Sequence, residues 1–464
     1  MYIFTFGYFV ILLKGVSDMK LKKILTACIL CASLTFSGCS FGSFSVDTLL
    51  QAPKLSKEQE GIYDALMKST GNNIALKYPK SGSNRSAYMV ANIDDEPTEE
   101  AIVFYEFNNT LPNVGNTDAA DAGVRLCVLD KNEKGEWQAV SDRAGAGTDV
   151  DRIIVSKLDG SGNISVIVGY STLSINEKVM EVYNYSQSDL TLAAQDSYSV
   201  METLDIDNDG YNEIITVQSG GDNGLATASL LSMSDGQIVK TNIINMSERF
   251  QSVASYVKGK LTEYNKALFI DCRYDESRLQ TEFLYYKYDS LQNPVAKMGS
   301  DLADLTVRPD GYYSTDMDND GIVEIPTVKP MPGYELLAPE EQMYLTTWNA
   351  YRDYYELYPK YVGYYSISGG YMLSFPEEWQ SAVTVKRDAI TGEAVFYVFD
   401  TSLEETKQEF MRITISSRDD AEEYEKRGYN RITSVGQIDY LVRFSGSVED
   451  VDLSKIKSRF YVIS

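Results

Sequence analysis

The pattern of apolar and polar positions divides the chain into a short helix, a long β-rich region and a mixed C-terminal region. Within residues 57–72, apolar residues recur at helical spacing, at Ile62, Ala65 and Leu66. From residue 73 to 360, short segments alternate between apolar and polar positions, which is typical of half-buried β-strands. The chain is therefore expected to be mainly β and to end in a smaller α+β domain.

The C-terminal region, residues 365–464, mixes strand patterns with helix patterns. Glycine and helix-capping residues separate its segments. The expected elements are strands at 383–387, 393–399 and 412–416, helices at 403–410, 419–427 and 451–459, and a hairpin around Gly436. This order predicts an independent α+β sandwich domain.

Two short strings interrupt the β-rich region, DIDNDGYNEI at 205–214 and DMDNDGIVEI at 316–325. Each places carboxylates at the first, third, fifth and ninth positions of one loop, and a glycine at the sixth. Four carboxylates this close repel one another unless a cation neutralises them, and a hard divalent ion such as calcium takes 6–8 oxygen ligands. The predicted ligands are Asp205, Asp207, Asp209 and Glu213 in the first loop, and Asp316, Asp318, Asp320 and Glu324 in the second.

Three weaker copies of the loop make the pattern a repeat. The copy at 92–100 keeps Asn92, Asp94, Glu96 and Glu100 at the four ligand positions but has Pro97 in place of the glycine, so it predicts a weaker metal site. The copies at 157–165 and 258–266 carry lysines at ligand positions, and those at 258, 260 and 266 could replace the charge of an ion. The five loops begin 65, 48, 53 and 58 residues apart, which favours the blades of a β-propeller.

The two full loops, each followed by an apolar strand, resemble the FG-GAP or VCBS-type repeats of integrin-like β-propellers. The resemblance covers roughly residues 73–360, although no FG-GAP string is present and the copies are fewer than that family's usual blades. It implies structural calcium between the strands of a blade, with the backbone carbonyls of Tyr211 and Ile322 completing the two ligand sets. The C-terminal region loosely resembles the PsbP/Mog1-like fold through the FPEEW string at 375–379.

The composition excludes several classes of function. The 464 residues include no histidine, which excludes Ser-His-Asp and Cys-His nucleophile systems and histidine-ligated metal sites. Removal of residues 1–38 takes away four lysines and one aspartate, which leaves 38 basic and 66 acidic residues and a net charge of −28. Such a charge disfavours nucleic acid as a partner and fits either a cation-binding exterior or simple solubility.

The N-terminal residues predict export and lipid anchoring. Met19 opens MKLKKILTACILCASLTFSGCS, in which lysines precede an apolar core and small residues precede Cys39. The layout resembles a bacterial lipoprotein signal, which implies acyl chains on Cys39 and a location on the extracellular face of the cell membrane. We expect a signal region at 1–38, with translation starting at Met19, and a lipid-anchored tether at 39–56. A transmembrane hairpin that starts at Met1 is the alternative reading.

The remaining cysteines and the tyrosine-rich stretch are each expected to have a structural role, although other roles stay open. Cys127 and Cys272 lie in apolar runs and are expected in buried strands, and a disulfide between them would need neighbouring strands. The tyrosine-rich stretch at 348–365 is expected to form the last propeller strands, with a sugar-stacking platform as the alternative.

Together these patterns predict a surface lipoprotein that acts as a binding or adhesion module with structural calcium, and that is not an enzyme. The ligand would be an unidentified protein or carbohydrate, and the lipid anchor would join the protein to the membrane. Two alternatives stay open. One is a polysaccharide-acting surface enzyme or its carbohydrate-binding accessory, which would need two convergent carboxylates. The other is a structural envelope or assembly protein.

Overall fold

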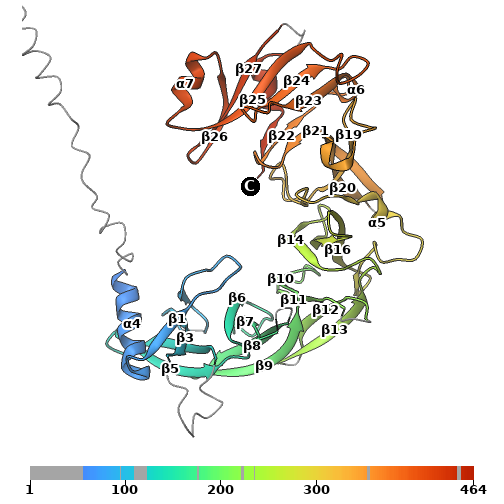
Figure 1. The fold of residues 1–464 in the computed structure, drawn as a ribbon. Helices are drawn as coiled ribbons and strands as arrows, with labels where there is room; N and C mark the ends of the chain where they lie inside the picture. The colour runs from blue at the N-terminus through green and yellow to red at the C-terminus, as the bar shows by residue number, and fades with distance from the viewer. Residues whose placement is uncertain are drawn as a thin grey trace, which may run out of the picture. The chain divides into compact units, whose positions relative to one another are not determined.

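The computed structural model describes residues 56–463 except 95, 109–122, 175–176, 221–223, 235, 353–355 and 447–450. The predicted signal region with Met19, the lipidation residue Cys39 and almost all of the tether at 39–56 lie outside the described residues. The described chain is mainly β, as predicted (Figure 1). Residues Gly61–Ser464 form one compact unit. No helix in this described part is long and apolar enough to cross a membrane.

The predicted N-terminal helix is α4 (Lys57–Thr70), which begins with a reciprocal cap. The Gln59 N–H donates to Ser56 Oγ at 3.1 Å, and the Ser56 N–H donates to Gln59 Oε1 at 3.0 Å. Ile62, Ala65 and Leu66 are buried against the first sheet, so the helical spacing of these apolar residues marks the packed face.

Five sheets follow one another along the β-rich region, and their described strands pair antiparallel. The first contains β1 (Ile74–Lys77), β2 (Tyr88–Ala91), β3 (Glu100–Phe107), β4 (Arg125–Lys131) and β5 (Trp137–Ala144). The second contains β6 (Asp149–Ser156), β7 (Ser165–Ser171), β8 (Lys178–Ser186) and β9 (Asp189–Tyr198). The third contains β10 (Val200–Leu204), β11 (Glu213–Gln218), β12 (Thr227–Ser234) and β13 (Gln237–Asn245).

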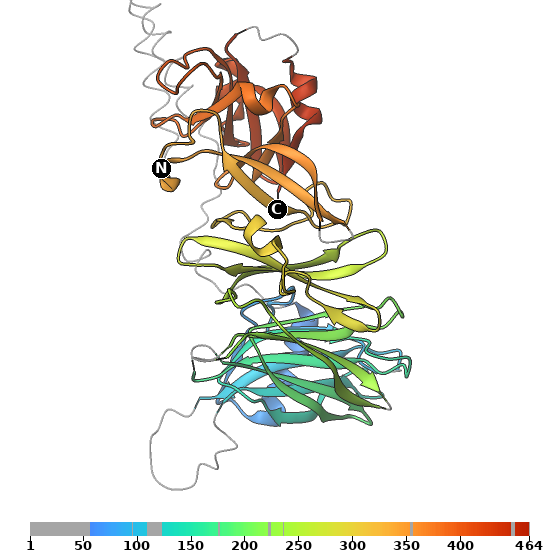
Figure 2. The ribbon, with the colours of Figure 1, turned by 90° about the vertical axis from the view of Figure 1, so that its right-hand side faces the viewer.

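The fourth sheet contains β14 (Val253–Lys260), β15 (Lys266–Arg273), β16 (Arg278–Lys287), β17 (Ser290–Gln292) and β18 (Arg308–Pro309), and the short helix α5 (Leu302–Leu305) precedes β18. The fifth contains β19 (Ile325–Pro330), β20 (Tyr344–Arg352), β21 (Glu356–Ser366), β22 (Tyr371–Ser374) and β28 (Phe460–Val462), and the 3₁₀ turn η3 (Pro339–Glu341) precedes β20. Four strands run as a simple up-and-down meander in the second to fifth sheets (Figure 2). This strand order is that of propeller blades, so the region is propeller-like.

The buried apolar clusters join sheets that are neighbours in the sequence. One cluster joins the first and second sheets, and others join the second to the third, the third to the fourth and the fourth to the fifth. The second, third and fourth sheets thus each bury one face against the sheet formed just before and the other against the sheet formed just after, whereas the first sheet packs against α4 and the second sheet. The repeat units therefore pack in the order in which they occur in the sequence.

The C-terminal residues form a sixth sheet with three short helices. Its strands are β23 (Val383–Arg387), β24 (Ala394–Val398), β25 (Glu409–Ser417), β26 (Asn430–Val435) and β27 (Ile438–Phe444). The helices are α6 (Trp379–Ala382), α7 (Ala421–Lys426) and α8 (Leu453–Ser458). The fifth sheet continues past residue 365, because β22 pairs with β21 and the last strand, β28, pairs with β22. The separate domain at 365–464 stays a prediction.

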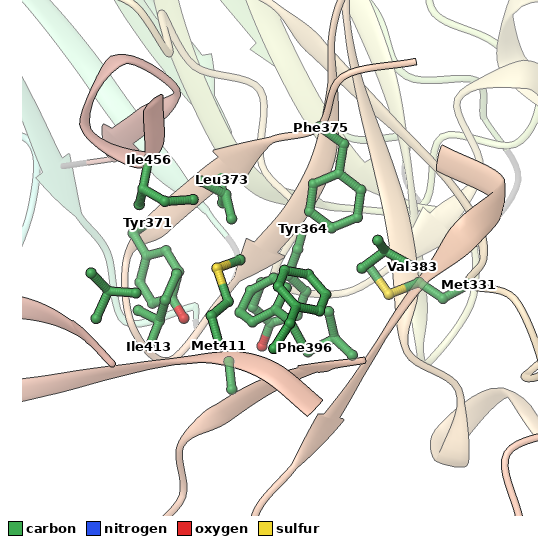
Figure 3. Packing of buried hydrophobic residues seen from close by; sticks show 14 of the residues in the cluster. Met331, Tyr364, Tyr371, Leu373, Phe375, Val383, Phe396, Met411, Ile413 and Ile456 are labelled. Carbon is green, nitrogen blue, oxygen red and sulfur yellow. The ribbon is translucent and has the colours of Figure 1, made fainter. Parts of the chain in front are cut away.

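A single large core joins the fifth and sixth sheets (Figure 3). Tyr364 of β21 and Phe396 of β24 meet edge to face, with ring centroids 5.6 Å apart. Tyr371 stacks on Phe460 at 5.0 Å. Aromatic pairs of this kind add to the stabilisation from buried area, so the tyrosine-rich stretch supplies core residues as well as strand surface.

The predicted helix at 403–410 is wrong, because those residues form a turn and the start of β25. The carbonyls a helix would use are occupied by other groups. Lys386 Nζ donates to the carbonyls of Leu403 at 2.6 Å and Thr406 at 3.0 Å, and the Val398 N–H donates to the Gln408 carbonyl at 3.0 Å. Pairing with the neighbouring strand overrides the local helical pattern.

The cysteines have the predicted structural role. Cys127 in β4 and Cys272 in β15 are both fully buried and unbridged. They lie in different sheets, the first and the fourth. Burial raises the pKa of both thiols, so neither is prepared to act as a nucleophile.

Candidate metal centre

Four of the five predicted loops have the same strand register. The residue before the first position pairs with the residue at the ninth position, in the pairs Ala91–Glu100, Ser156–Ser165, Leu204–Glu213 and Thr315–Glu324. Each loop therefore joins the same two places of its own sheet. The repeat predicted from spacing is a structural repeat.

The copy at 258–266 differs from the other four. Lys260 pairs with Lys266, so the turn of this copy is shorter and both Lys258 and Lys260 belong to β14. Its lysines contact the preceding acidic loop and its surroundings. Lys266 Nζ lies 2.8 Å from Asp205 Oδ2, and Lys258 Nζ lies 3.0 Å from Glu202 Oε1.

The backbone bends in the same way in both full loops. Asn208 and Asn319, at the fourth position, have φ of 65° and 62°, and Gly210 and Gly321, at the sixth, have φ of 97° and 87°. Positive φ is accessible to glycine at little cost and to asparagine more readily than to most residues. At the second position, Ile206 and Met317 are buried and anchor the loops to the core. The residues that follow these anchors are exposed at 207–209 in the first loop and at 319–320 in the second.

The first loop gathers three of its four predicted side-chain ligands. One oxygen each from Asp205, Asp207 and Glu213 lies within 4.8 Å of the others, and two ligands of one calcium ion are separated by no more than about 5 Å. Asp209 is not part of this group, and its Oδ1 accepts the Tyr211 N–H at 2.8 Å. The Glu213 carboxylate is buried and accepts the Ile206 N–H at 3.1 Å. These residues fit a divalent cation.

The second loop gathers Asp316, Asp318 and Asp320 within the same limit. Glu324 lies at the base of the loop, fully buried, and accepts the Met317 N–H at 2.9 Å. These three carboxylates could also hold a metal ion. They come from the first, third and fifth positions, whereas those of the first loop come from the first, third and ninth. The carbonyls of Tyr211 and Ile322 stay predicted ligands.

The loop at 92–100 does not gather its predicted ligands in the same way. Among the described residues, no three of its carboxylates approach one point, and Asn92 Nδ2 instead donates to the Glu96 carbonyl at 2.5 Å. Pro97 has a fixed negative φ and cannot make the bend that glycine makes at this position. Asp94 Oδ1 accepts the Glu96 N–H at 2.8 Å, and Glu100 is buried at the base. The weaker metal site here stays a prediction.

Two residues that the sequence analysis did not assign to the site reach the second loop from β21. Lys360 Nζ lies 2.8 Å from Asp318, 2.5 Å from Asp320 and 2.8 Å from Glu324. The hydroxyl of Tyr361 donates to Asp318 Oδ2 at 2.6 Å. The sequence marks the bulge beside them but not their partners, because a proline inside a strand pattern, here Pro359, indicates an edge or a bulge.

The charges of the two loops are compensated differently. Burial raises the pKa of Glu213 to about 7, and the nearby Asp207 adds to the rise. Burial also raises the pKa of Glu324, but the hydrogen bond from Lys360 opposes it. Burial acts to raise the pKa of Asp318 as well, but hydrogen bonds from Lys360 and Tyr361 outweigh it and lower this pKa. The second loop already holds a positive charge among its carboxylates.

Neighbouring loops are joined by backbone and side-chain hydrogen bonds. The Asn212 N–H donates to the Lys157 carbonyl at 2.9 Å, which joins the loops of the second and third sheets. Asn208 Nδ2 donates to the Tyr264 carbonyl at 3.1 Å, which joins the third and fourth. The Lys260 N–H donates to the Gly321 carbonyl at 2.8 Å, which joins the fourth and fifth. An ion in one loop would therefore stabilise contacts between sheets.

Comparisons with known proteins give no family for this chain. No family profile and no curated protein matches it. Among solved structures, it is similar to the exotype rhamnogalacturonan lyase YesX, with 10% identity over 69% of this chain and a TM-score of 0.27, and it spans 61% of that protein. It is also similar to a rhamnogalacturonan lyase of Bacillus licheniformis (12% identity, 70% of this chain and 73% of that one, TM-score 0.29) and to the Dos1 propeller (9%, 79% and 95%, TM-score 0.27). Similarity this low carries no argument about function, and the strand order of the sheets themselves makes the fold propeller-like.

Proposed function

We propose that this protein is a non-catalytic binding module of the bacterial cell surface, held by a lipid anchor at Cys39 and stabilised by calcium in its acidic loops. The observation that carries the proposal is the gathering of acidic ligands at the same position of two propeller-like sheets. The anchor is supported by the residues around Cys39 alone, and fractionation of a Cys39→Ala variant would test it.

Calcium suits the first loop better than the softer transition metals do. The donors are carboxylates, which hard cations prefer, and no histidine is available for softer metals. Asp205 and Asp207 are partly or largely exposed, so an ion can enter from solvent. Calcium sites of extracellular modules bind weakly, with Kd values of roughly 10⁻⁴–10⁻³ M, because calcium outside the cell is abundant. The role of the ion in this proposal is structural.

Calcium is expected to raise the free energy of unfolding of the full chain by about 2.7 kcal/mol at a concentration one hundred times its Kd. The reason is that the ion binds the folded loop and not the unfolded chain. Urea denaturation with calcium and with a chelator measures the difference. Asp207→Asn should remove most of the increase, because Asp207 is one of the three gathered ligands of the first loop.

The matched control is Asp159→Asn, which changes the same third position in the copy at 157–165. That copy has Lys157 and Ser165 where the full loops have carboxylates, so its calcium response should equal that of the wild type. Calcium-independent stability in a folded wild-type protein would refute the calcium part of the proposal.

A carbohydrate is the ligand class that exposed tyrosines favour. Tyr211 and Tyr264 both stand at the seventh position of neighbouring loops, and they are 38% and 81% exposed. The two loops are joined by the hydrogen bond from Asn208 to the Tyr264 carbonyl. Exposed aromatic rings offer an apolar face on a polar surface, which suits the face of a sugar ring.

We expect the full chain to bind at least one immobilised polysaccharide, and Tyr264→Ala to weaken that binding about tenfold or more by removing one ring contact. The control is Tyr288→Ala, because Tyr288 is equally exposed, at 84%, but lies in the turn between β16 and β17, outside the loops. Surface plasmon resonance on a polysaccharide panel measures both. Equal losses for the two variants would contradict a site at the loops.

The enzyme alternative has one concrete location to test. An open hollow of about 480 Å³ is lined by Asp301 and Glu356 together with Thr327 and Asn349. Both carboxylates are exposed, whereas a substrate site usually encloses most of its ligand. Cleavage of a polysaccharide in the same panel that Glu356→Gln abolishes would replace the binding proposal by an enzymatic one.

A further inference from the structure

The ammonium group of Lys360 lies among three of the four carboxylates that are predicted to bind a metal ion in the second loop. Its Nζ atom is within 2.5–2.8 Å of oxygens from Asp318, Asp320 and Glu324. Calcium binds the same kind of oxygen at 2.3–2.6 Å. The Lys360 ammonium and a calcium ion therefore cannot both contact these oxygens at the same place.

A β-bulge directs Lys360 toward the loop. Trp348 pairs with Tyr361 and Asn349 pairs with Pro359, so Lys360 is the extra residue of β21 and has no partner in β20. In a regular strand, consecutive side chains point to opposite faces. Here Lys360 and Tyr361 both contact Asp318, because the bulge breaks the alternation.

The same bulge recurs in four sheets, between the second and third strands after the repeat loop. In each sheet, the residue directly after the ninth loop position lies on the first strand and pairs with a residue of the second strand that borders the bulge. The pairs are Ala101–Leu129, Val166–Tyr183, Ile214–Leu231 and Ile325–Asn349. The extra residues at the four equivalent positions are Val140, Ala193, Thr241 and Lys360. Lys360 is the one of these four that carries a charge.

The first full loop therefore has Thr241 at the position that Lys360 occupies for the second. The Thr241 hydroxyl donates to the Leu230 carbonyl within its own sheet, at 3.3 Å. The cation that does contact the first loop, Lys266, reaches one carboxylate, Asp205. Among the described residues, no lysine or arginine is paired with Asp207 or Glu213. These two carboxylates remain available to an external ion.

We propose that Lys360 is a built-in counter-ion, so that the two full loops are not equivalent: the first takes the divalent ion, and the second is closed by its own lysine. This inference rests on the proposed calcium binding and assigns it to one loop. An ion entering the second loop must displace Lys360, which breaks three charge-assisted hydrogen bonds. The affinity of the second loop is lowered by the cost of that displacement.

The test is calcium titration of the full chain by calorimetry, with two opposite substitutions. Lys360→Met keeps the length of the side chain and removes its charge, and it is expected to raise the number of bound ions from one to two. Thr241→Lys places an ammonium at the equivalent bulge of the third sheet, and it is expected to weaken the ion of the first loop about tenfold or more. Asp207→Asn in the Lys360→Met background should leave one ion, bound at the second loop.

The outcomes separate this inference from the calcium proposal. Two equal ions in the wild type, with no change in Lys360→Met or Thr241→Lys, would overturn the assignment of Lys360 and leave calcium binding intact. No ion in the wild type or in folded Lys360→Met would overturn calcium binding itself. Circular dichroism melting checks the fold of each variant, and because the two substitutions lie in different sheets, misfolding of one leaves the other as a complete test.

Discussion

Replacement of Arg308 by methionine is expected to lower the free energy of unfolding by about 3–5 kcal/mol, because it leaves a buried carboxylate without its counter-charge. Arg308 is 1% exposed, and its Nη2 lies 2.6 Å from Asp271 Oδ1. It also donates to the carbonyls of Tyr312 at 2.6 Å and Thr306 at 2.8 Å. These contacts fix β18 and the segment that leads to the second acidic loop onto the fourth sheet. Urea denaturation of the variant and the wild type measures the loss.

The control is Arg249→Met, which removes an ion pair with Asp304 at the protein surface. Exposed pairs are screened by water and salt, so this variant should unfold close to the wild type. The expected contrast depends on burial, because both substitutions remove one arginine and one ion pair. Equal losses would show that the Asp271–Arg308 pair is not a special stabilising contact.

Replacement of Trp348 by alanine is expected to cost about 3–5 kcal/mol through the cavity it leaves. Trp348 is fully buried, packs against Met317 and Met372, and meets Tyr365 edge to face with centroids 5.5 Å apart. Since Met317 holds the second position of the second loop, the variant should also loosen that loop. Chemical denaturation gives the cost, and hydrogen exchange at the Met317 amide reports on the loop.

Trp137→Ala is the matched comparison for the same change of side chain. Trp137 lies at the start of β5 and is only partly buried, with Lys131 Nζ 4.4 Å from its ring centre. Its removal should cost clearly less, and the exchange rate at Met317 should not change. A larger loss for Trp137→Ala than for Trp348→Ala would contradict the expectation that the cost follows the burial of the side chain.

The loops were predictable because their signal is local. Carboxylates at fixed positions, followed by glycine and an apolar strand, predict a cluster of acidic side chains and the place where the strand begins. Three carboxylates do gather in each full loop, and Glu213 begins β11. The mainly β character and most strands after residue 365 were predictable for the same reason. Alternation over a few residues decides which side of a strand is buried.

The sequence could not show contacts that depend on how neighbouring strands are aligned. Lys360 stands in a tyrosine-rich stretch, and nothing nearby indicates that its partners lie about forty residues earlier, at Asp318 to Glu324. The bulge that directs it depends on how β20 and β21 align. The helix predicted at 403–410 failed for a similar reason, because the groups that capture its carbonyls, Lys386 and Val398, come from strands outside the segment.

The packing of each sheet against its sequence neighbours has a consequence for how the chain is made. A sheet that needs only the preceding sheet as its partner can fold as soon as its own residues emerge during synthesis, without waiting for distant residues. The exception is β28, which returns to pair with β22 after the sixth sheet has formed between them in sequence. Assembly of the chain can therefore proceed from its beginning toward its end, whereas the pairing of β28 with β22 has to wait until the residues of the sixth sheet have been made.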